Sequence, residues 1–344
     1  MNGETIRAEA RPNCCVCGGA GSIVYSGIPD RLFAAPGKWT IVRCGNADCG
    51  LLWLDPMPAA EELHKAYRDY YTHGDAEPWP VSPLYTRWVK NAYLAAKFGY
   101  RALDPGFPGR ILRWILYFLH PVRRTELDAS VMYLPAHDGG RLLEIGFGSG
   151  GLLKKMRAVG WRAEGLDFDP VCVERARAEG FEARLGSLKD ARYPDDCFDA
   201  VIMSHAFEHV PDPQELLREI RRILKPGGRF VSLTPNAAAY GHRKFKSYWL
   251  ALDPPRHLHL FTPAALRLAL SRISFATVKV FTTINGASYI HLASRDVEKT
   301  GRHRFGGPLN QAEWRRGRRF QLLEWFMLWF QPDAGEELVV VAVK

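Results

Sequence analysis

Short apolar runs alternate with amphipathic segments along the chain from about residue 139 onward. RLLEIG and FDAVIMS are apolar runs of strand length, and each precedes a segment with helical periodicity, such as LLKKMRAVG or DPQELLREIRRIL. Strands that alternate with helices are joined by crossovers, so they form a mostly parallel sheet with helices on both faces. Further strands are predicted at WRAEGLD, FEARLG, GRFVSLTPN, FATVKVFTT and EELVVVAVK. The pattern therefore predicts a doubly wound α/β domain.

The bulk composition adds little to this picture. The 344 residues are 47% hydrophobic and carry a net charge of +9, which suits a globular chain with an acidic ligand, a nucleic acid or an anionic membrane surface. The first residues, MNGETIRAEARPN, lack the apolar core of a secretory signal, and no run of about 18 apolar residues follows. We therefore expect a cytoplasmic protein, with peripheral contact to the inner face of the membrane as an alternative.

Five of the seven cysteines lie in the first fifty residues, in two clusters. CCVCGG and RCGNADCG give a C-x2-C pair and a C-x4-C pair, each next to glycines that allow a tight turn around a metal. In a cytoplasmic chain such pairs favour metal binding over disulfides. The spacing predicts a structural Zn²⁺ ribbon, which stabilises a segment too small for a large core. The predicted ligands are Cys14, Cys17, Cys44 and Cys49.

These features divide the chain into three predicted domains. Residues 1–57 form the zinc ribbon, 58–138 form a helical lid or linker, and 139–344 form the α/β domain. The α/β domain carries an insertion at 286–335, directly before its last strand.

The turn after the first predicted strand reads EIGFGSGG and is rich in glycine. Glycines here let the backbone approach a ligand at the carboxyl end of the sheet. Glu144, two residues before the first glycine, disfavours a pyrophosphate and suits a cationic ligand. Asp167 ends the second strand, where a carboxylate holds the two hydroxyls of a ribose.

These residues resemble the class I S-adenosylmethionine-dependent methyltransferases. The resemblance rests on E-x-G-x-G-x-G from Glu144 to Gly150, on GLDFDP at 165–170, on the segment 186–199 and on LKPGGRF at 224–230. It implies a Rossmann-like, seven-stranded sheet whose last strand is antiparallel, with S-adenosylmethionine at its carboxyl edge. Ser187 departs from the family, which often has Asp there, so an adenine contact from this position is in doubt. The cofactor-binding residues that the resemblance implies are Glu144, Gly146, Phe147, Gly148, Gly150, Asp167, Phe168, Ser187, Leu188, Ser204 and His205.

The segment HAFEH, from His205 to His209, also fits the H-x-x-E-H pattern of a zinc protease group. That pattern needs a helix to bring both imidazoles to one face, whereas this segment is predicted as a loop after FDAVIMS and before VPDP. In the family, an E-H pair in this loop borders the acceptor. The resemblance thus implies Glu208 and His209 as the catalytic pair, with His209 as a general base that Glu208 orients. Two alternatives stay open: a metal held by His205, Glu208 and His209, and a purely structural role.

The segment DPPRHLHLFT resembles one wall of the acceptor pocket in relatives that combine this fold with a zinc ribbon. The residues predicted to touch the acceptor are Tyr248, Trp249, Arg256 and His257. Such relatives modify sugars in polysaccharide or natural-product pathways. The resemblance therefore implies O-methylation, or C-methylation, of a small-molecule or glycan acceptor.

Two basic and aromatic segments, ILRWILYFLHPVRR and WRRGRRFQLLEWFMLWF, indicate contact with an anionic membrane or a lipid-linked acceptor, or simply a solvated basic surface. Three other functions remain in competition: an RNA methyltransferase, a non-catalytic S-adenosylmethionine-binding protein and an NAD-dependent enzyme. No base-reading segment supports the first. The sequence does not identify the acceptor, the methylated atom or the oligomeric state.

Overall fold

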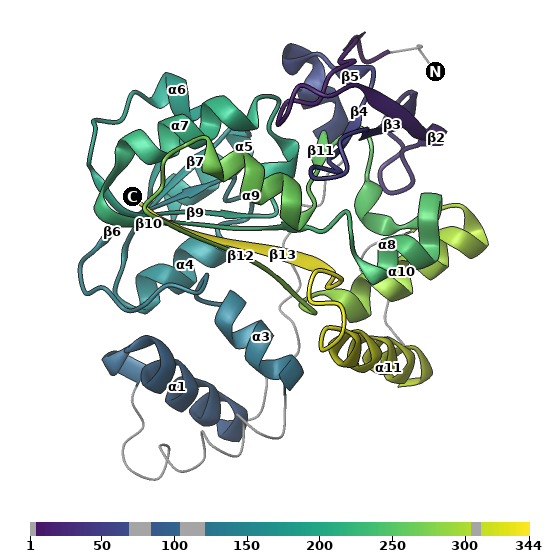
Figure 1. Cartoon of the computed structure of the whole chain (residues 1–344). Helices are drawn as coiled ribbons and strands as arrows, with labels where there is room; N and C mark the ends of the chain where they lie inside the picture. Colours follow the sequence, from purple (N-terminus) through teal and green to yellow (C-terminus); the bar gives the residue numbers. More distant parts are fainter. Residues whose placement is uncertain (1–4, 69–83, 104–120, 304–310) are drawn as a thin grey trace. The chain divides into compact units, whose positions relative to one another are not determined.

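The computed structural model describes residues 5–68, 84–103, 121–303 and 311–344 (Figure 1). The chain divides into two compact units. The first unit comprises Met1–Tyr71, His205–Arg218 and Leu233–Val340, and the second comprises Thr72–Ser204, Glu219–Ser232 and Val341–Lys344. Both units are discontinuous in sequence, because the chain passes between them several times.

A seven-stranded sheet forms the centre of the α/β fold, with the strand order β12-β13-β10-β9-β6-β7-β8. The pairs β6–β7, β6–β9 and β7–β8 are parallel. The apolar runs form these strands because helices cover the sheet on both faces, so that alternate side chains on either side are buried. The strands are β6 (Arg141–Ile145), β7 (Arg162–Asp167), β8 (Glu182–Leu185), β9 (Phe198–Ser204), β10 (Leu224–Pro235), β12 (Thr277–Thr283) and β13 (Glu337–Val343).

Strand β13 runs antiparallel to β10. The amide of Gly227 donates to the carbonyl of Lys344, and the amide of Lys344 donates to that of Gly228, at the start of β10 and the end of β13. At the opposite ends, the amide of Asn236 donates to the carbonyl of Glu336. The predicted α/β fold with a mostly parallel seven-stranded sheet and an antiparallel last strand is therefore confirmed.

Short helices connect the strands, and their caps are visible in the sequence. Asp169 accepts a hydrogen bond from the Val171 amide and precedes Pro170, while Thr262 accepts one from the Ala265 amide and precedes Pro263. These caps begin α5 and α9. The connecting helices are α4 (Gly151–Ala158), α5 (Pro170–Ala178), α6 (Leu188–Ala191), α7 (Pro213–Ile223) and α9 (Pro263–Ser271).

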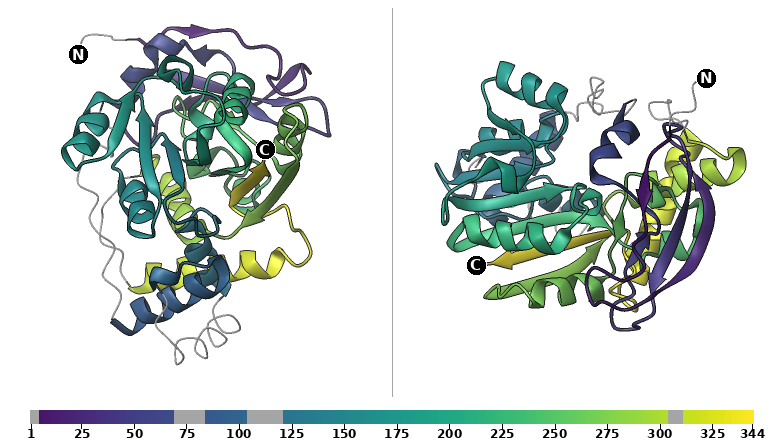
Figure 2. Two further views of the ribbon diagram at one scale, coloured as in Figure 1. Left: turned by 90° about the vertical axis from the view of Figure 1, so that its left-hand side faces the viewer. Right: turned by 90° about the horizontal axis from the view of Figure 1, so that it is seen from above.

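The N-terminal ribbon is completed by a strand from the second half of the chain. Strand β11 pairs antiparallel with β4, so that His259 lies opposite Trp53, in a sheet of order β11-β4-β3-β2. The β2–β3 hairpin is seen along its length in Figure 2. The ribbon therefore extends beyond the predicted 1–57 segment. Its strands are β2 (Gly21–Pro29), β3 (Lys38–Cys44), β4 (Leu52–Leu54) and β11 (His259–Leu260), beside the small β1 (Ala8–Glu9) and β5 (Met57–Pro58) pair.

The segment predicted as a helical lid contains helices in its described residues. They are η1 (Ala60–Tyr67), α1 (Leu84–Phe98), η3 (Arg101–Leu103) and α3 (Pro121–Ala129). The aromatic stretch ILRWILYFLH, at 111–120, lies outside the described residues. Whether these residues act as a lid stays a prediction.

The predicted insertion at 286–335 consists largely of two helices, α10 (Ala287–Thr300) and α11 (Gln311–Met327), which pack side by side (Figures 1 and 2). Before β11, the chain forms the short helices α8 (Tyr240–Phe245), η5 (Lys246–Tyr248) and η6 (Leu250–Leu252). Among the residues that the structure describes, no helix is long and apolar enough to cross a membrane.

Candidate active site

The Gly-rich turn after β6 lies against the carboxylate at the end of β7. Gly146, Gly148 and Gly150 have left-handed φ angles of 73°, 52° and 74°, which a residue with a side chain rarely adopts. Oδ2 of Asp167 accepts a hydrogen bond of 2.9 Å from the Gly148 amide, and Oδ1 accepts one of 3.0 Å from the Asp169 amide. The structure thus brings together the turn and the carboxylate that the sequence predicts to hold a nucleoside.

Two carboxylates make this part of the second unit electronegative. Glu144 is buried, and its Oε2 has no hydrogen-bond partner within the described residues. Burial, reinforced by the charge of Asp167, raises the pKa of Glu144 well above its usual value. Burial also raises the pKa of Asp167, although the Gly148 amide opposes the shift. A cationic ligand would relieve both effects, whereas a pyrophosphate would add to the repulsion. The residues therefore fit S-adenosylmethionine better than a dinucleotide.

The other residues of this unit that were predicted to bind the cofactor differ in burial and in hydrogen bonding. The ring of Phe147 packs against β7, where a Cβ on Gly165 would come within 2.5 Å of it. Only the backbone of Phe147 is thus left for a ligand. Phe168 is half exposed, Leu188 is buried, and the Ser187 hydroxyl accepts the Asp190 amide as the cap of α6. Their contacts with the cofactor stay predictions.

The loop that follows Ser204 belongs to the first unit and places Glu208 in a fully buried position. A single 3₁₀ turn, η4 (Phe207–His209), forms there instead of a longer helix, as the loop prediction expects. Oε2 of Glu208 accepts a hydrogen bond of 2.9 Å from the Thr234 hydroxyl. Oε1 has no hydrogen-bond partner in the described chain, and lies 3.9 Å from Nε2 of His257. A buried carboxylate oxygen is thus available to a proton or a cation.

Two neutral imidazoles accompany this carboxylate. Nδ1 of His209 lies 2.9 Å from the carbonyl of Arg256, and Nδ1 of His257 lies 2.7 Å from that of Ala251. Because a carbonyl only accepts, we assign the proton of each ring to Nδ1 and a free lone pair to Nε2. Burial lowers the pKa of His209 to about 4 and that of His257 to about 3. Both rings are therefore uncharged near neutral pH.

Glu208, His209 and His257 each offer a ligand atom within 4.8 Å of the others, in a geometry that suits a cation. This trio differs from the predicted alternative of His205, Glu208 and His209. Nε2 of His205 instead lies 3.2 Å from Oε1 of the buried Glu337, at the start of β13. Partial desolvation disfavours the imidazolium of His205, whose side chain is 51% exposed, but Glu337 and Glu208 outweigh this effect and raise the pKa of His205 to about 9. A protonated His205 cannot ligate a metal.

The residues predicted to touch the acceptor differ in their exposure to solvent. Tyr248 is 40% exposed, and the guanidinium of Arg31 lies 4.9 Å from its ring centre. Trp249 is buried, donates to the Glu336 carboxylate, and borders a small surface hollow that Arg31 also lines. The prediction for Arg256 is not supported. Its side chain is 0% exposed and ion-paired on both sides, so it has a structural role.

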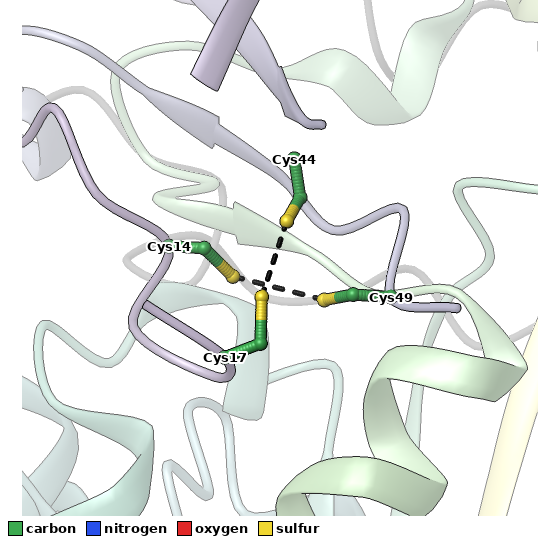
Figure 3. A group of neighbouring side chains, drawn as sticks. All are labelled: Cys14, Cys17, Cys44 and Cys49. Atoms are coloured by element: carbon green, nitrogen blue, oxygen red, sulfur yellow. Dashed lines mark hydrogen bonds between the residues drawn. The ribbon is translucent and has the colours of Figure 1, made fainter. Parts of the chain in front are cut away.

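The four predicted zinc ligands converge on one point (Figure 3). The Sγ atoms of Cys14 and Cys49 lie 3.7 Å apart, and those of Cys17 and Cys44 lie 3.3 Å apart. Tetrahedral zinc with Zn–S bonds of about 2.3 Å requires sulfur separations of about 3.8 Å. The thiols therefore fit a Zn²⁺ ion with slight expansion, while the exposed Cys15 lies outside the group.

Sequence reasoning missed Thr234, Glu337 and Asp30, which hold Glu208, His205 and Arg256 respectively. Of these three residues, only Glu337 could have been found from the sequence, because a carboxylate that begins the apolar strand ELVVVAV needs a buried partner. Thr234 lies in an apolar strand and Asp30 in a loop, so neither is distinguishable by pattern.

The chain is similar to known methyltransferases in sequence. Residues 118–280 match the family model described as a methyltransferase domain. The chain is 33% identical over 153 residues to a ubiquinone biosynthesis O-methyltransferase of Xanthomonas oryzae pv. oryzae, covering 42% of this chain and 62% of that protein. For the Alkalilimnicola ehrlichii protein of the same name, identity is 31% over 154 residues, covering 42% and 59%. The chain thus spans about three fifths of the length of these relatives.

Among solved structures, the chain is similar to Haemonchus contortus phosphoethanolamine N-methyltransferase 2 bound to phosphomonomethylethanolamine and S-adenosylhomocysteine. The TM-score is 0.46 and the identity 19%, covering 85% of this chain and 62% of that one. The family resemblance predicted from Glu144–Gly150 and Asp167 is confirmed by the domain match and the curated relatives.

Proposed function

Because residues 118–280 form a methyltransferase domain, we propose that this chain methylates a hydroxyl of a small-molecule or glycan acceptor with S-adenosylmethionine. One observation carries the proposal. The loop that continues directly from β9 of that domain holds a buried carboxylate, Glu208, between imidazoles that are neutral near pH 7. A neutral imidazole beside a buried carboxylate is suited to receiving a proton from a hydroxyl, because the carboxylate stabilises the imidazolium.

The cofactor supplies an activated methyl group on a sulfonium, so the chain itself has to bind, align and deprotonate. Asp167 holds the ribose hydroxyls, because its Oδ atoms keep free lone pairs after accepting two amides. The sulfonium favours the ionised form of Glu144, and ionised Glu144 in turn favours the cationic cofactor over its neutral product. This difference assists release of the product.

His209 is the proposed general base, and Glu208 stabilises the imidazolium that forms. The low pKa keeps His209 unprotonated down to about pH 4, so the base is available through the neutral range. It also makes His209 a weak base, which suits a phenolic or otherwise acidic hydroxyl.

A cation at Glu208, His209 and His257 is the second candidate, and the low pKa of both imidazoles favours it. Carboxylate and imidazole ligands suit Mn²⁺, Fe²⁺ or Zn²⁺. Such an ion would lower the pKa of a hydroxyl bound to it. The Nδ1–H groups that donate to Arg256 and Ala251 would fix the ligating tautomers.

The curated relatives support an aromatic hydroxyl as the acceptor. They are named ubiquinone biosynthesis O-methyltransferases, and an O-methyltransferase acts on a hydroxyl. A lipid-linked acceptor would agree with the exposed apolar face of α11, considered below. We therefore place catechols and lipid-linked phenols first in an acceptor screen, and glycans second.

Asp167→Ala is expected to weaken binding of S-adenosylhomocysteine at least 100-fold, since it removes the ribose contact. Isothermal titration calorimetry of the zinc-loaded protein measures this. Asp169→Ala is the matched control, because it removes a neighbouring carboxylate that caps α5, and it should change the Kd less than about threefold. Equal binding by the Asp167 variant would contradict the cofactor site and, with it, the proposed function.

Glu208→Gln and His209→Ala are each expected to lower kcat about 10²–10⁴-fold while leaving the Kd of S-adenosylhomocysteine unchanged. His303→Ala, which removes an imidazole that pairs with Asp296 elsewhere in the first unit, is the control. An increase in kcat when Mn²⁺ is added to the zinc-loaded wild type, but not to zinc-loaded His257→Phe, would select the cation over the direct base. Normal turnover by both Glu208 and His209 variants would refute the catalytic assignment.

A further inference from the structure

The inner side of α11 is fixed tightly to its neighbours in the first unit. A Cβ on Gly317 would lie 3.1 Å from the carbonyl of Ser288 on α10, so the two helix backbones approach closely there. Phe320 stacks on His291 with ring centres 4.0 Å apart, and Gln321 donates a 2.9 Å hydrogen bond to the Ile284 carbonyl. These contacts determine which side of α11 faces outward.

The opposite side of α11 and the turn after it expose arginines and large apolar side chains. Phe326 is 55% exposed, Trp329 70% and Phe330 73%. At 100° per residue, Arg315, Leu322 and Phe326 project within about 40° of one another, so basic and apolar residues share one face. The outer face of α11 comprises Arg315, Arg316, Arg318, Arg319, Leu322, Leu323, Phe326, Trp329 and Phe330.

The two kinds of side chain are separated along the helix axis. The four arginines occupy the N-terminal half of the face, and the apolar side chains occupy the C-terminal half. Arg315 and Phe326 are eleven residues apart, which is about 16 Å along the axis. The acidic residues of α11 are Glu313, at its first turn, and Glu324, which is buried on the inner side. The nine described residues of the outer face therefore include four arginines and no acidic residue.

An anionic bilayer satisfies both halves of this face at once. Lipid phosphates pair with the arginines, while the apolar half enters the boundary between headgroups and acyl chains, where Trp is favoured. A nucleic acid would neutralise the arginines but leave the apolar half in water. A second copy packed about a two-fold axis through the same patch would have to avoid bringing its arginines together.

We propose that the outer face of α11 docks this protein onto the surface of an anionic membrane. The basic half lies at the level of the lipid phosphates, and Phe326, Trp329 and Phe330 insert below it. The net charge of +9 adds long-range attraction to the same surface. This inference does not depend on the methyl-transfer chemistry, and it gives the predicted 286–335 insertion a role.

Flotation of the full-length, zinc-loaded protein with vesicles tests the proposal. Vesicles of phosphatidylcholine with roughly 30 mol% phosphatidylglycerol should bind the wild type, whereas pure phosphatidylcholine should bind it weakly. Replacing Arg315 and Arg319 by Gln should weaken binding about 25-fold, at about fivefold for each cation near the surface. Replacing Phe326, Trp329 and Phe330 by Ser should weaken it about 100-fold or more. All these side chains are exposed, so the substitutions should leave S-adenosylhomocysteine binding unchanged.

Lys38→Gln and Ile23→Ser are matched controls, because both side chains are exposed on the ribbon of the same unit, and they should bind vesicles like the wild type. Three results would overturn the proposal. The first is absence of wild-type binding to anionic vesicles. The second is RNA binding that the arginine variant loses and the apolar variant keeps, with no vesicle binding. The third is a dimer that the apolar variant converts to a monomer, again without vesicle binding.

Discussion

Replacement of Cys44 by serine is expected to unfold the sheet of β2, β3, β4 and β11 and to abolish methyl transfer, although the metal lies outside the acceptor site. Zinc binding to a four-thiolate site contributes about 10–16 kcal/mol to folding of such segments. The effect should reach the catalytic loop through β11. The Leu54 amide donates to the Leu258 carbonyl at 3.1 Å, and the Leu258 amide donates to the Glu208 carbonyl at 2.9 Å. Loss of the ribbon thus removes the support of Glu208.

Elemental analysis and thermal unfolding measure this expectation. Wild type should contain about one zinc per chain, and the Cys44→Ser variant should contain little. Cys15→Ser is the matched control, because this exposed thiol lies outside the cluster, and it should keep both zinc and stability. A Cys44 variant that retains full zinc and an unchanged melting temperature would contradict the ribbon assignment.

The sheet and the cofactor turn were predictable because each has a local cause. Strands β6 and β9 are buried on both faces and therefore appear as apolar runs, and the glycines after β6 mark a turn with positive φ angles. The paired thiols are likewise a spacing pattern. The strand directions follow from the crossovers, so the fold class required no long-range information.

The pairing of β11 with the ribbon and the side-chain contacts of the site depend on residues that are distant in sequence. Trp53 pairs with His259, and Asp30 pairs with Arg256, across separations for which the chain carries no local signature. The choice between His205 and His257 as a ligand beside Glu208 has the same origin, since Nδ1 of His205 and Nε2 of His257 lie 3.8 and 3.9 Å from its Oε1. Both histidines lie in predicted loops, and only the hydrogen bonds of their rings decide which one offers a lone pair. Spacing can place a residue on a loop but cannot orient its side chain.

Arg256→Met is expected to lower the free energy of unfolding by about 3–5 kcal/mol. This is the largest effect on stability that we expect outside the zinc site. The guanidinium pairs with Asp30 at 2.8 Å and with Asp253, and all three side chains are buried. Burial opposes ionisation of Asp30, but Arg256 and backbone amides outweigh it and lower its pKa. Without Arg256, two buried carboxylates would face each other unpaired. Thermal unfolding should then begin roughly 10 °C lower.

Two further variants separate charge from packing. Arg267→Met removes a comparable ion pair, to Asp333, in which both side chains are about half exposed, and it should cost less than about 1 kcal/mol. Combining Arg256→Met with Asp30→Asn and Asp253→Asn should recover much of the lost stability, because no buried charge then lacks a partner. If the triple variant is as unstable as Arg256→Met alone, the loss comes from packing of the long side chain against Phe33, whose ring centre lies 4.8 Å from the guanidinium.

The carbonyl of Arg256 also accepts a hydrogen bond from His209, so the same substitution should disturb the catalytic loop. We therefore expect turnover of Arg256→Met to fall even at temperatures where the protein remains folded.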